Sequence, residues 1–85
     1  MIVEGYEVPR SIEDAAVAEI RRRSGFSASE IIAFLHRAGV PTRPVLADHG
    51  EWGPAHRIAD RILQRERRAG RIEFRRGLWH RATSP

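Results

Sequence analysis

The chain has 85 residues, no cysteine and a formal net charge of +4, and its basic residues are fifteen arginines without a lysine. This length fits one small domain that buries somewhat over ~60% of its extended-chain surface, which leaves little room for a deep catalytic pocket. The lack of cysteine excludes a disulfide scaffold, a thiolate zinc site and a cysteine nucleophile. No stretch resembles a signal peptide or approaches the ~20 apolar residues that span a bilayer, so we expect a cytoplasmic protein without a membrane partner.

Charge is divided unevenly along the sequence. Residues 1–53 hold six arginines and eight acidic residues, a net charge of −2, whereas residues 54–85 hold nine arginines and three acidic residues, a net charge of +6. A GC-rich genome explains arginine in place of lysine, but it does not explain the clustering. The asymmetry favours a nucleic acid or another anionic surface as the partner.

The N-terminal part predicts an arm and a first helix. Residues 1–10 alternate apolar residues with a glycine and end in Pro9-Arg10, which favours an extended arm or an edge strand. Ser11 is the expected cap of the first helix, which has acidic residues in its first turn and three arginines in its last turn. Gly25 is expected to end this helix.

A second helix and a long loop follow. Ser27 and Glu30 predict a capping box for a helix that runs to about Ala38 and stops at Gly39. Residues 40–53 contain prolines and glycines without periodicity, so we expect a loop much longer than the turn of a standard helix-turn-helix motif.

Two interpretations apply to the end of this loop. Trp52 is interpreted as a hydrophobic anchor that packs beside the third helix. Four polar residues nearby raise the alternative of a metal site, although their spacing matches no ligand signature. They are Asp48, His49, Glu51 and His56.

The third helix is predicted over residues 54–69, because Pro54 suits a first helical position and Gly70 suits a left-handed cap. One side is an apolar stripe at three- and four-residue spacing. The stripe consists of Ala55, Ile58, Ala59, Ile62, Leu63 and Ala69. The other side carries His56, Arg57, Asp60, Arg61, Gln64 and Arg68. Since this side consists largely of hydrogen-bond donors, it could enter a DNA groove.

After the third helix the periodicity changes to two, which predicts an antiparallel hairpin over residues 71–81. A two-residue turn would place Phe74 opposite Trp79 and Ile72 opposite Arg81, with an aromatic pair against the helices. A one-residue bulge at the turn glycine would change this register, and the sequence leaves both forms open.

Arg75, Arg76 and Gly77 form the tip of this hairpin in either register, and a basic tip suits phosphates or a minor groove. Residues 82–85 are expected to be disordered. The predicted fold class is α+β, mainly α, with three helices and then a two-stranded antiparallel hairpin, in one domain over residues 11–81.

This order of elements resembles a winged helix-turn-helix domain. The densest match is residues 62–72, Ile-Leu-Gln-Arg-Glu-Arg-Arg-Ala-Gly-Arg-Ile. In that family the helix before the glycine is the recognition helix and the hairpin is the wing. Residues 26–63 are also similar to the DNA-binding recombinase module of large serine recombinases, which has a similarly lengthened turn. The sequence departs from the winged-helix pattern in its long loop and in a segment before the second helix too short for the usual first strand, so Phe26 or the N-terminal arm would flank the hairpin.

The resemblance and the charge distribution imply binding to double-stranded DNA, in a small regulator or an accessory protein of a phage or mobile element. The expected contacts to base edges are His56, Arg57, Arg61 and Gln64. The expected contacts to phosphates are Arg65, Arg68, Arg71, Arg75 and Arg76. The alternative is a winged-helix module that binds a protein and not DNA. No catalytic residue, metal or cofactor is expected, because no catalytic or phosphate-loop motif is present. The sequence leaves a homodimer possible but does not indicate one.

Overall fold

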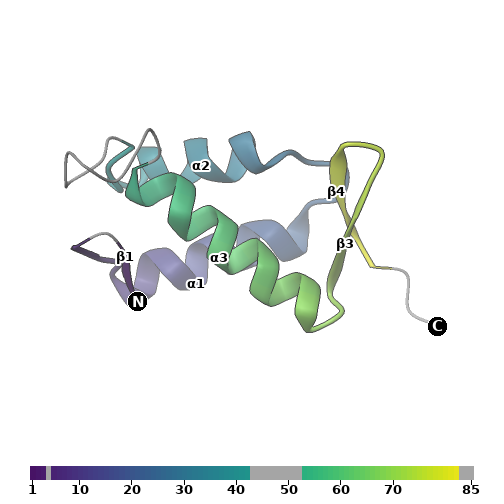
Figure 1. Cartoon of the computed structure of the whole chain (residues 1–85), viewed down its shortest axis with the longest axis horizontal. Coiled ribbons are helices and arrows are strands. Elements are labelled where there is room, and N and C mark those ends of the chain that lie inside the picture. The colour runs from purple at the N-terminus through teal and green to yellow at the C-terminus, as the bar shows by residue number, and fades with distance from the viewer. Residues whose placement is uncertain (4, 43–52, 83–85) are drawn as a thin grey trace.

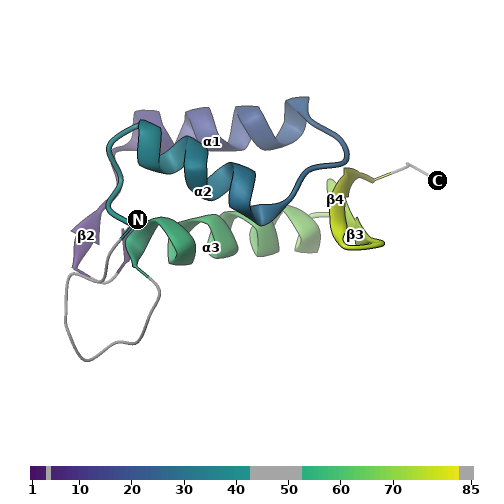
Figure 2. The ribbon, with the colours of Figure 1, turned by 90° about the horizontal axis from the view of Figure 1, so that it is seen from above.

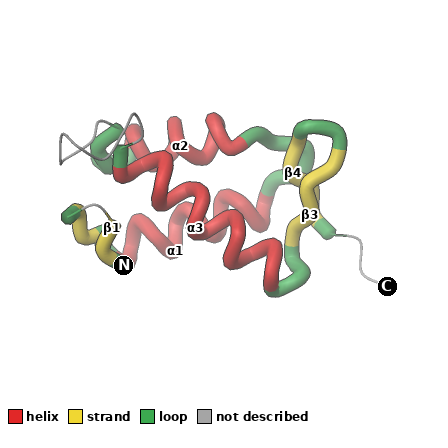
Figure 3. The backbone as a smooth tube through the Cα atoms, viewed as in Figure 1, coloured by secondary structure: helices red, strands yellow, loops and turns green. Residues whose placement is uncertain are grey.

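The structure is a computed structural model that describes residues 1–3, 5–42 and 53–82. Within these residues it contains three helices and two antiparallel strand pairs (Figures 1 and 3). The elements are β1 (Ile2–Val3), β2 (Tyr6–Glu7), α1 (Arg10–Arg22), α2 (Ala28–Arg37), α3 (Pro54–Arg68), β3 (Ile72–Arg75) and β4 (Leu78–Arg81). The predicted α+β, mainly α, class is therefore confirmed.

The helices stack in depth, with α2 between α1 and α3, and the two strand pairs lie at opposite ends of the molecule (Figure 2). The buried apolar side chains come from all three helices, from both strand pairs and from the connections between elements. They are Val3, Val8, Ala16, Ile20, Phe26, Ile31, Leu35, Val40, Ala55, Ile58, Ala59, Ile62, Leu63, Ile72 and Trp79. Because α2 and the hairpin lie behind and beside α3, one side of α3 remains at the surface.

The N-terminal segment differs from the predicted extended arm, because β1 and β2 pair with each other, Ile2 opposite Glu7. Gly5 lies in the turn between them with φ of +77°, a conformation that glycine adopts without steric penalty. The prediction that Ser11 caps α1 is also wrong. Pro9 is the N-cap residue, and its carbonyl oxygen accepts hydrogen bonds from two amide groups of the first turn. Proline lacks an N–H and has a helix-compatible φ, so it suits this boundary.

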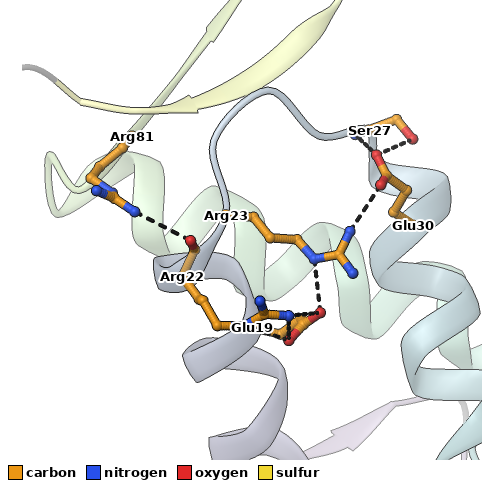
Figure 4. Close-up of polar contacts among 6 residues, drawn as sticks. All are labelled: Glu19, Arg22, Arg23, Ser27, Glu30 and Arg81. Atoms are coloured by element: carbon orange, nitrogen blue, oxygen red, sulfur yellow. Dashed lines mark hydrogen bonds and ion pairs between the residues drawn. The ribbon is translucent and has the colours of Figure 1, made fainter.

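The ends of α1 and α2 follow different rules. α1 ends at Arg22, and the next residue, Arg23, is the C-cap with an extended backbone conformation. Gly25, predicted to end this helix, lies beyond the C-cap and does not cap α1. The capping box of α2 is confirmed, since the backbone N–H of Ser27 donates to Glu30 Oε2 at 2.8 Å (Figure 4). α2 ends at Arg37, close to the predicted stop.

α3 has nearly the predicted bounds, with Pro54 as its first residue and Ala69 as its C-cap. The predicted apolar stripe is buried except at its end. Ala69 is exposed, and the last turn of the stripe is occupied by Glu66, whose side chain is 1% exposed. The difference arises because Ala69 is the cap residue and lies past the last turn that packs on the core.

The C-terminal hairpin has the two-residue turn, with Phe74 opposite Trp79, so the alternative with a bulge does not form. Arg76 and Gly77 both have positive φ, 52° and 79°, as the tight hairpin turn requires. The two aromatic rings meet edge to face, with centroids 5.0 Å apart. Only Trp79 packs against the helices, however, since Phe74 is 56% exposed. Phe74 and Trp79 therefore form the predicted aromatic pair, but only Trp79 belongs to the core.

A backbone bridge attaches this hairpin to the connection between α1 and α2. The N–H of Trp79 donates to the Phe26 carbonyl at 2.7 Å, and the N–H of Phe26 donates back at 3.0 Å. Phe26 therefore flanks β4 at the position of a third strand, one of the two arrangements that the sequence left open.

Candidate nucleic-acid interface

The outward side of α3 is a row of four residues at spacings of four, three and four. They are Arg57, Arg61, Gln64 and Arg68. At 100° per residue they lie together on the side opposite the buried stripe, along roughly 16 Å of helix. The three arginines are exposed and Gln64 is half-exposed. The structure thus brings together three of the four predicted base-edge residues and one predicted phosphate contact. We call these four residues the outward row.

His56, the fourth predicted base-edge residue, lies on the flank of α3 and is half-buried. It lines a groove of about 330 Å³ between α2, α3 and β4. The groove is also lined by Ala28, Ser29, Ile32, Ala59, Asp60, Leu63 and Trp79. His56 is therefore not part of the outward row, because its position points it toward α2.

Two of the predicted phosphate contacts, Arg68 and Arg76, are exposed. Within residues 1–3, 5–42 and 53–82 neither forms an ion pair with a carboxylate. Arg76 lies at the hairpin tip, where its positive φ turns the backbone. Arg67, which sequence reasoning counted only toward net charge, is exposed on α3 and donates to Gln64 Oε1 at 2.9 Å. Arg68 and Arg76 therefore keep their donors available to an external anion, whereas the Nε of Arg67 is already engaged.

Two other predicted phosphate contacts already hold a carboxylate. Arg65 lies on the flank of α3 that faces α1, and its Nη1 donates to Glu13 Oε1 at 2.8 Å. In β3, Arg75 Nε lies 2.9 Å from Glu73 Oε1. Half or nearly half of each arginine side chain remains exposed, so each pair stays accessible to solvent.

The fifth predicted phosphate contact, Arg71, belongs to a cluster around Glu66. Arg71 Nη1 donates to Glu66 Oε2 at 2.7 Å, and Arg21 Nε of α1 donates to Glu66 Oε1 at 2.8 Å. Burial by itself would raise the pKa of Glu66, but the hydrogen bonds and positive charges of the two arginines outweigh burial and lower it. The ionised carboxylate thus joins α1, α3 and the start of the hairpin.

Sequence reasoning did not identify this cluster. A signal for it exists, because Glu66 follows Ile62 by four positions and Leu63 by three, which places an acidic residue in the apolar stripe of α3. A charged residue is almost never fully buried unless it is paired, so a carboxylate at this position requires cationic partners.

The arginines at the end of α1 also serve the fold. Arg22 and Arg23 both donate to Glu19, and Arg23 Nη1 reaches Glu30 of α2 at 2.9 Å, which links the two helices (Figure 4). Hydrogen bonding from Arg22, followed by that from Arg23, lowers the pKa of Glu19. Arg81 Nη2 donates to the Arg22 carbonyl at 3.2 Å, so this hairpin arginine faces the helices.

Some predictions concern residues that the structure does not describe. The proposed anchor Trp52 lies outside the described residues, as do Asp48, His49 and Glu51 of the alternative metal site. Among the described residues, no group of three histidine or acidic side chains could hold a metal ion. In the same part of the chain, no helix has the length and apolar character needed to cross a membrane.

The described arginines therefore form two groups. One group is held by carboxylates or carbonyl groups of the fold, whereas Arg61, Arg68 and Arg76 are exposed and form no ion pair within the described residues. No protein-family model, no curated protein and no solved structure matches this chain. Its function must be inferred from its own residues.

Proposed function

We propose that this chain is a winged helix-turn-helix domain that binds double-stranded DNA, as a small regulator or an accessory protein of a phage or mobile element. In this proposal α3 is the recognition helix and the hairpin of β3 and β4 is the wing. The order of elements supports the proposal, as does Phe26, which lies where winged helices have their first strand. Exposure of α3 along one side supports it as well (Figure 2).

The observation that carries the proposal is the outward row. An α-helix fits the major groove, where arginine can donate two hydrogen bonds to guanine and glutamine can pair with adenine. Arg57, Arg61 and Gln64 present these groups on one side of α3. Arg68 continues the row toward the hairpin, and Arg76 extends the positive charge to its tip. Both would neutralise phosphates and release counterions.

The remaining candidates are expected to contribute less. Arg65, Arg71 and Arg75 each hold a carboxylate, so a phosphate must compete with a charge already present. His56 can reach a base edge only from the flank of α3 that faces α2.

The test is the salt dependence of binding to a random duplex, measured by fluorescence anisotropy. If Arg68 and Arg76 alone neutralise phosphates, the slope of log affinity against log salt concentration is about −2. If all five predicted phosphate contacts do so, the slope is about −4.5. A slope near zero would contradict the electrostatic part of the proposal. Failure of the chain to bind duplex DNA at low salt would instead favour the alternative, a protein-interaction module.

A pair of matched variants tests the location of the interface. Arg61→Gln with Arg68→Gln removes two charges from the outward row, and we expect affinity to fall at least about tenfold with a slope shallower by about one to two. Arg10→Gln with Arg22→Gln removes the same charge from α1, which lies on the opposite side of the molecule (Figure 2). Equal losses in the two variants would mean that net charge, and not the outward row, determines binding.

A further inference from the structure

The C-terminal hairpin exposes large apolar side chains beside its basic tip. Phe74 is 56% exposed and Leu78 is 38% exposed, and between them lie Arg75, Arg76 and the turn glycine. The hairpin does not need Phe74 for its attachment, because Trp79 is buried and its backbone is bonded to Phe26. The exposed ring therefore has no evident role in folding.

The ring of Phe74 nevertheless has a defined position. It meets the ring of Trp79 edge to face, with centroids 5.0 Å apart and an interplanar angle of 63°. Trp79 is fixed by burial and by the backbone bridge, so it provides a rigid support. An aromatic side chain held in this way loses little conformational entropy when it contacts a partner.

The charge around Phe74 indicates which partner it contacts. Arg76, which forms no ion pair within the described residues, and the half-exposed Arg75 lie next to it in sequence. An acidic protein surface would match the arginines, but the proposed DNA-binding row of α3 ends beside the same hairpin (Figure 1). Proteins that reach into the minor groove combine arginine with apolar wedges that enter between base pairs and bend the duplex.

We infer that Phe74 is such a wedge: it enters a base step of the minor groove next to the major-groove site of α3 and bends the DNA. The inference depends on the proposed function and specifies the form of DNA that the protein binds. Flexible pyrimidine–purine steps are the easiest to open, so a TA step at this position is preferred over a stiff A-tract.

The experiment follows bending and affinity together. A duplex of about 30 base pairs with a central TA step carries a dye at each end, and a bend brings the dyes closer and raises energy transfer. We expect the wild-type protein to raise the transfer. Phe74→Ala abolishes the rise and weakens binding about tenfold, the size of one lost aromatic–base contact. Phe74→Leu, which retains an apolar wedge, keeps most of the bend.

Two controls separate this effect from others. Ile2→Ala removes an exposed large apolar side chain far from the hairpin, 64% exposed on β1 at the opposite end of the molecule, and leaves bending and affinity unchanged. If Phe74→Ala fails to fold, the wild-type protein on a duplex with a central A-tract supplies the test, because it then shows weaker binding and a smaller rise in transfer.

Three outcomes would overturn the inference. Wild-type protein that binds the duplex without a change in transfer would leave DNA binding intact and exclude the wedge. Bending that survives in Phe74→Ala would assign it to another residue. Wild-type protein that binds no duplex would contradict the proposed function itself.

Discussion

The three consecutive arginines at the end of α1 and the arginines spaced along the outward side of α3 differ in their surroundings. Arg21, Arg22 and Arg23 each donate to a carboxylate, on Glu66 or Glu19. Within the described part of the chain, Arg61 and Arg68 have no such partner. The comparison shows that consecutive arginines in a sequence do not by themselves predict an unpaired positive surface, because the fold can place carboxylates within their reach.

The difference has a simple physical origin. Acidic residues of α1, α2 and α3 lie at positions that face the end of α1, where the arginines join helices that are distant in sequence. On α3 itself, Asp60 is the acidic residue beside the outward row, and within the described residues Arg61 and Arg68 form no ion pair. The positive charge at the end of α1 is therefore balanced by carboxylates, whereas Arg61 and Arg68 form no ion pair within the described residues and would attract a polyanion.

The largest effect is expected from Glu66→Gln, which tests whether the paired arginines hold the fold. The amide keeps the volume of the side chain but cannot accept two charge-assisted hydrogen bonds, so we expect the free energy of unfolding to fall by about 2 kcal/mol. Urea unfolding followed by circular dichroism measures the change. The matched control is Arg22→Gln, because the Arg22 side chain that pairs with Glu19 is exposed to solvent. For this variant we expect the free energy of unfolding to fall by less than about 0.5 kcal/mol. Equal losses of unfolding free energy in the two variants would mean that the Glu66 cluster stabilises the fold no more than an exposed ion pair does.

A smaller change in the free energy of unfolding is expected when the pH is lowered. The pKa of Glu66 is below its ordinary value of 4.5 in the folded chain, so the ionised carboxylate stabilises the fold above that value. This contribution is lost as the pH falls through the folded-state pKa. The difference in unfolding free energy between wild type and Glu66→Gln should therefore be constant near neutral pH and shrink in acid. Urea unfolding of both proteins between about pH 3 and pH 7 measures it. A difference that stays constant would mean that the carboxylate charge is not the cause.

Local signals in the sequence were sufficient for several elements. Pro54 and Gly70 bound α3 because each suits one helix end, and Arg76-Gly77 forms the tight turn because glycine tolerates positive φ. Ser27 and Glu30 satisfy each other's backbone donors within four residues, so the start of α2 was also predictable.

Features that depend on distant residues were not predictable. The strands β1 and β2 have two residues each, too short to show a period, and Pro9 caps α1 without a side-chain hydrogen bond. The contact between Arg65 and Glu13 spans 52 positions, and no spacing rule connects them. Three of the five predicted phosphate contacts hold carboxylates, and for Arg65 the partner is distant in sequence, whereas Arg71 and Arg75 pair with acids five and two positions away.

The smallest effect is expected from Glu73→Gln, which moves one arginine from the paired group to the solvent-facing group. Loss of the carboxylate frees Arg75 Nε, now 2.9 Å from Glu73, for a phosphate, so DNA affinity should rise about two- to threefold and the salt slope should steepen by up to about one. Glu7→Gln removes the same charge from the exposed strand β2 at the other end and controls for net charge. If the two variants bind equally, the hairpin does not approach the phosphates, and contact with DNA would be confined to α3.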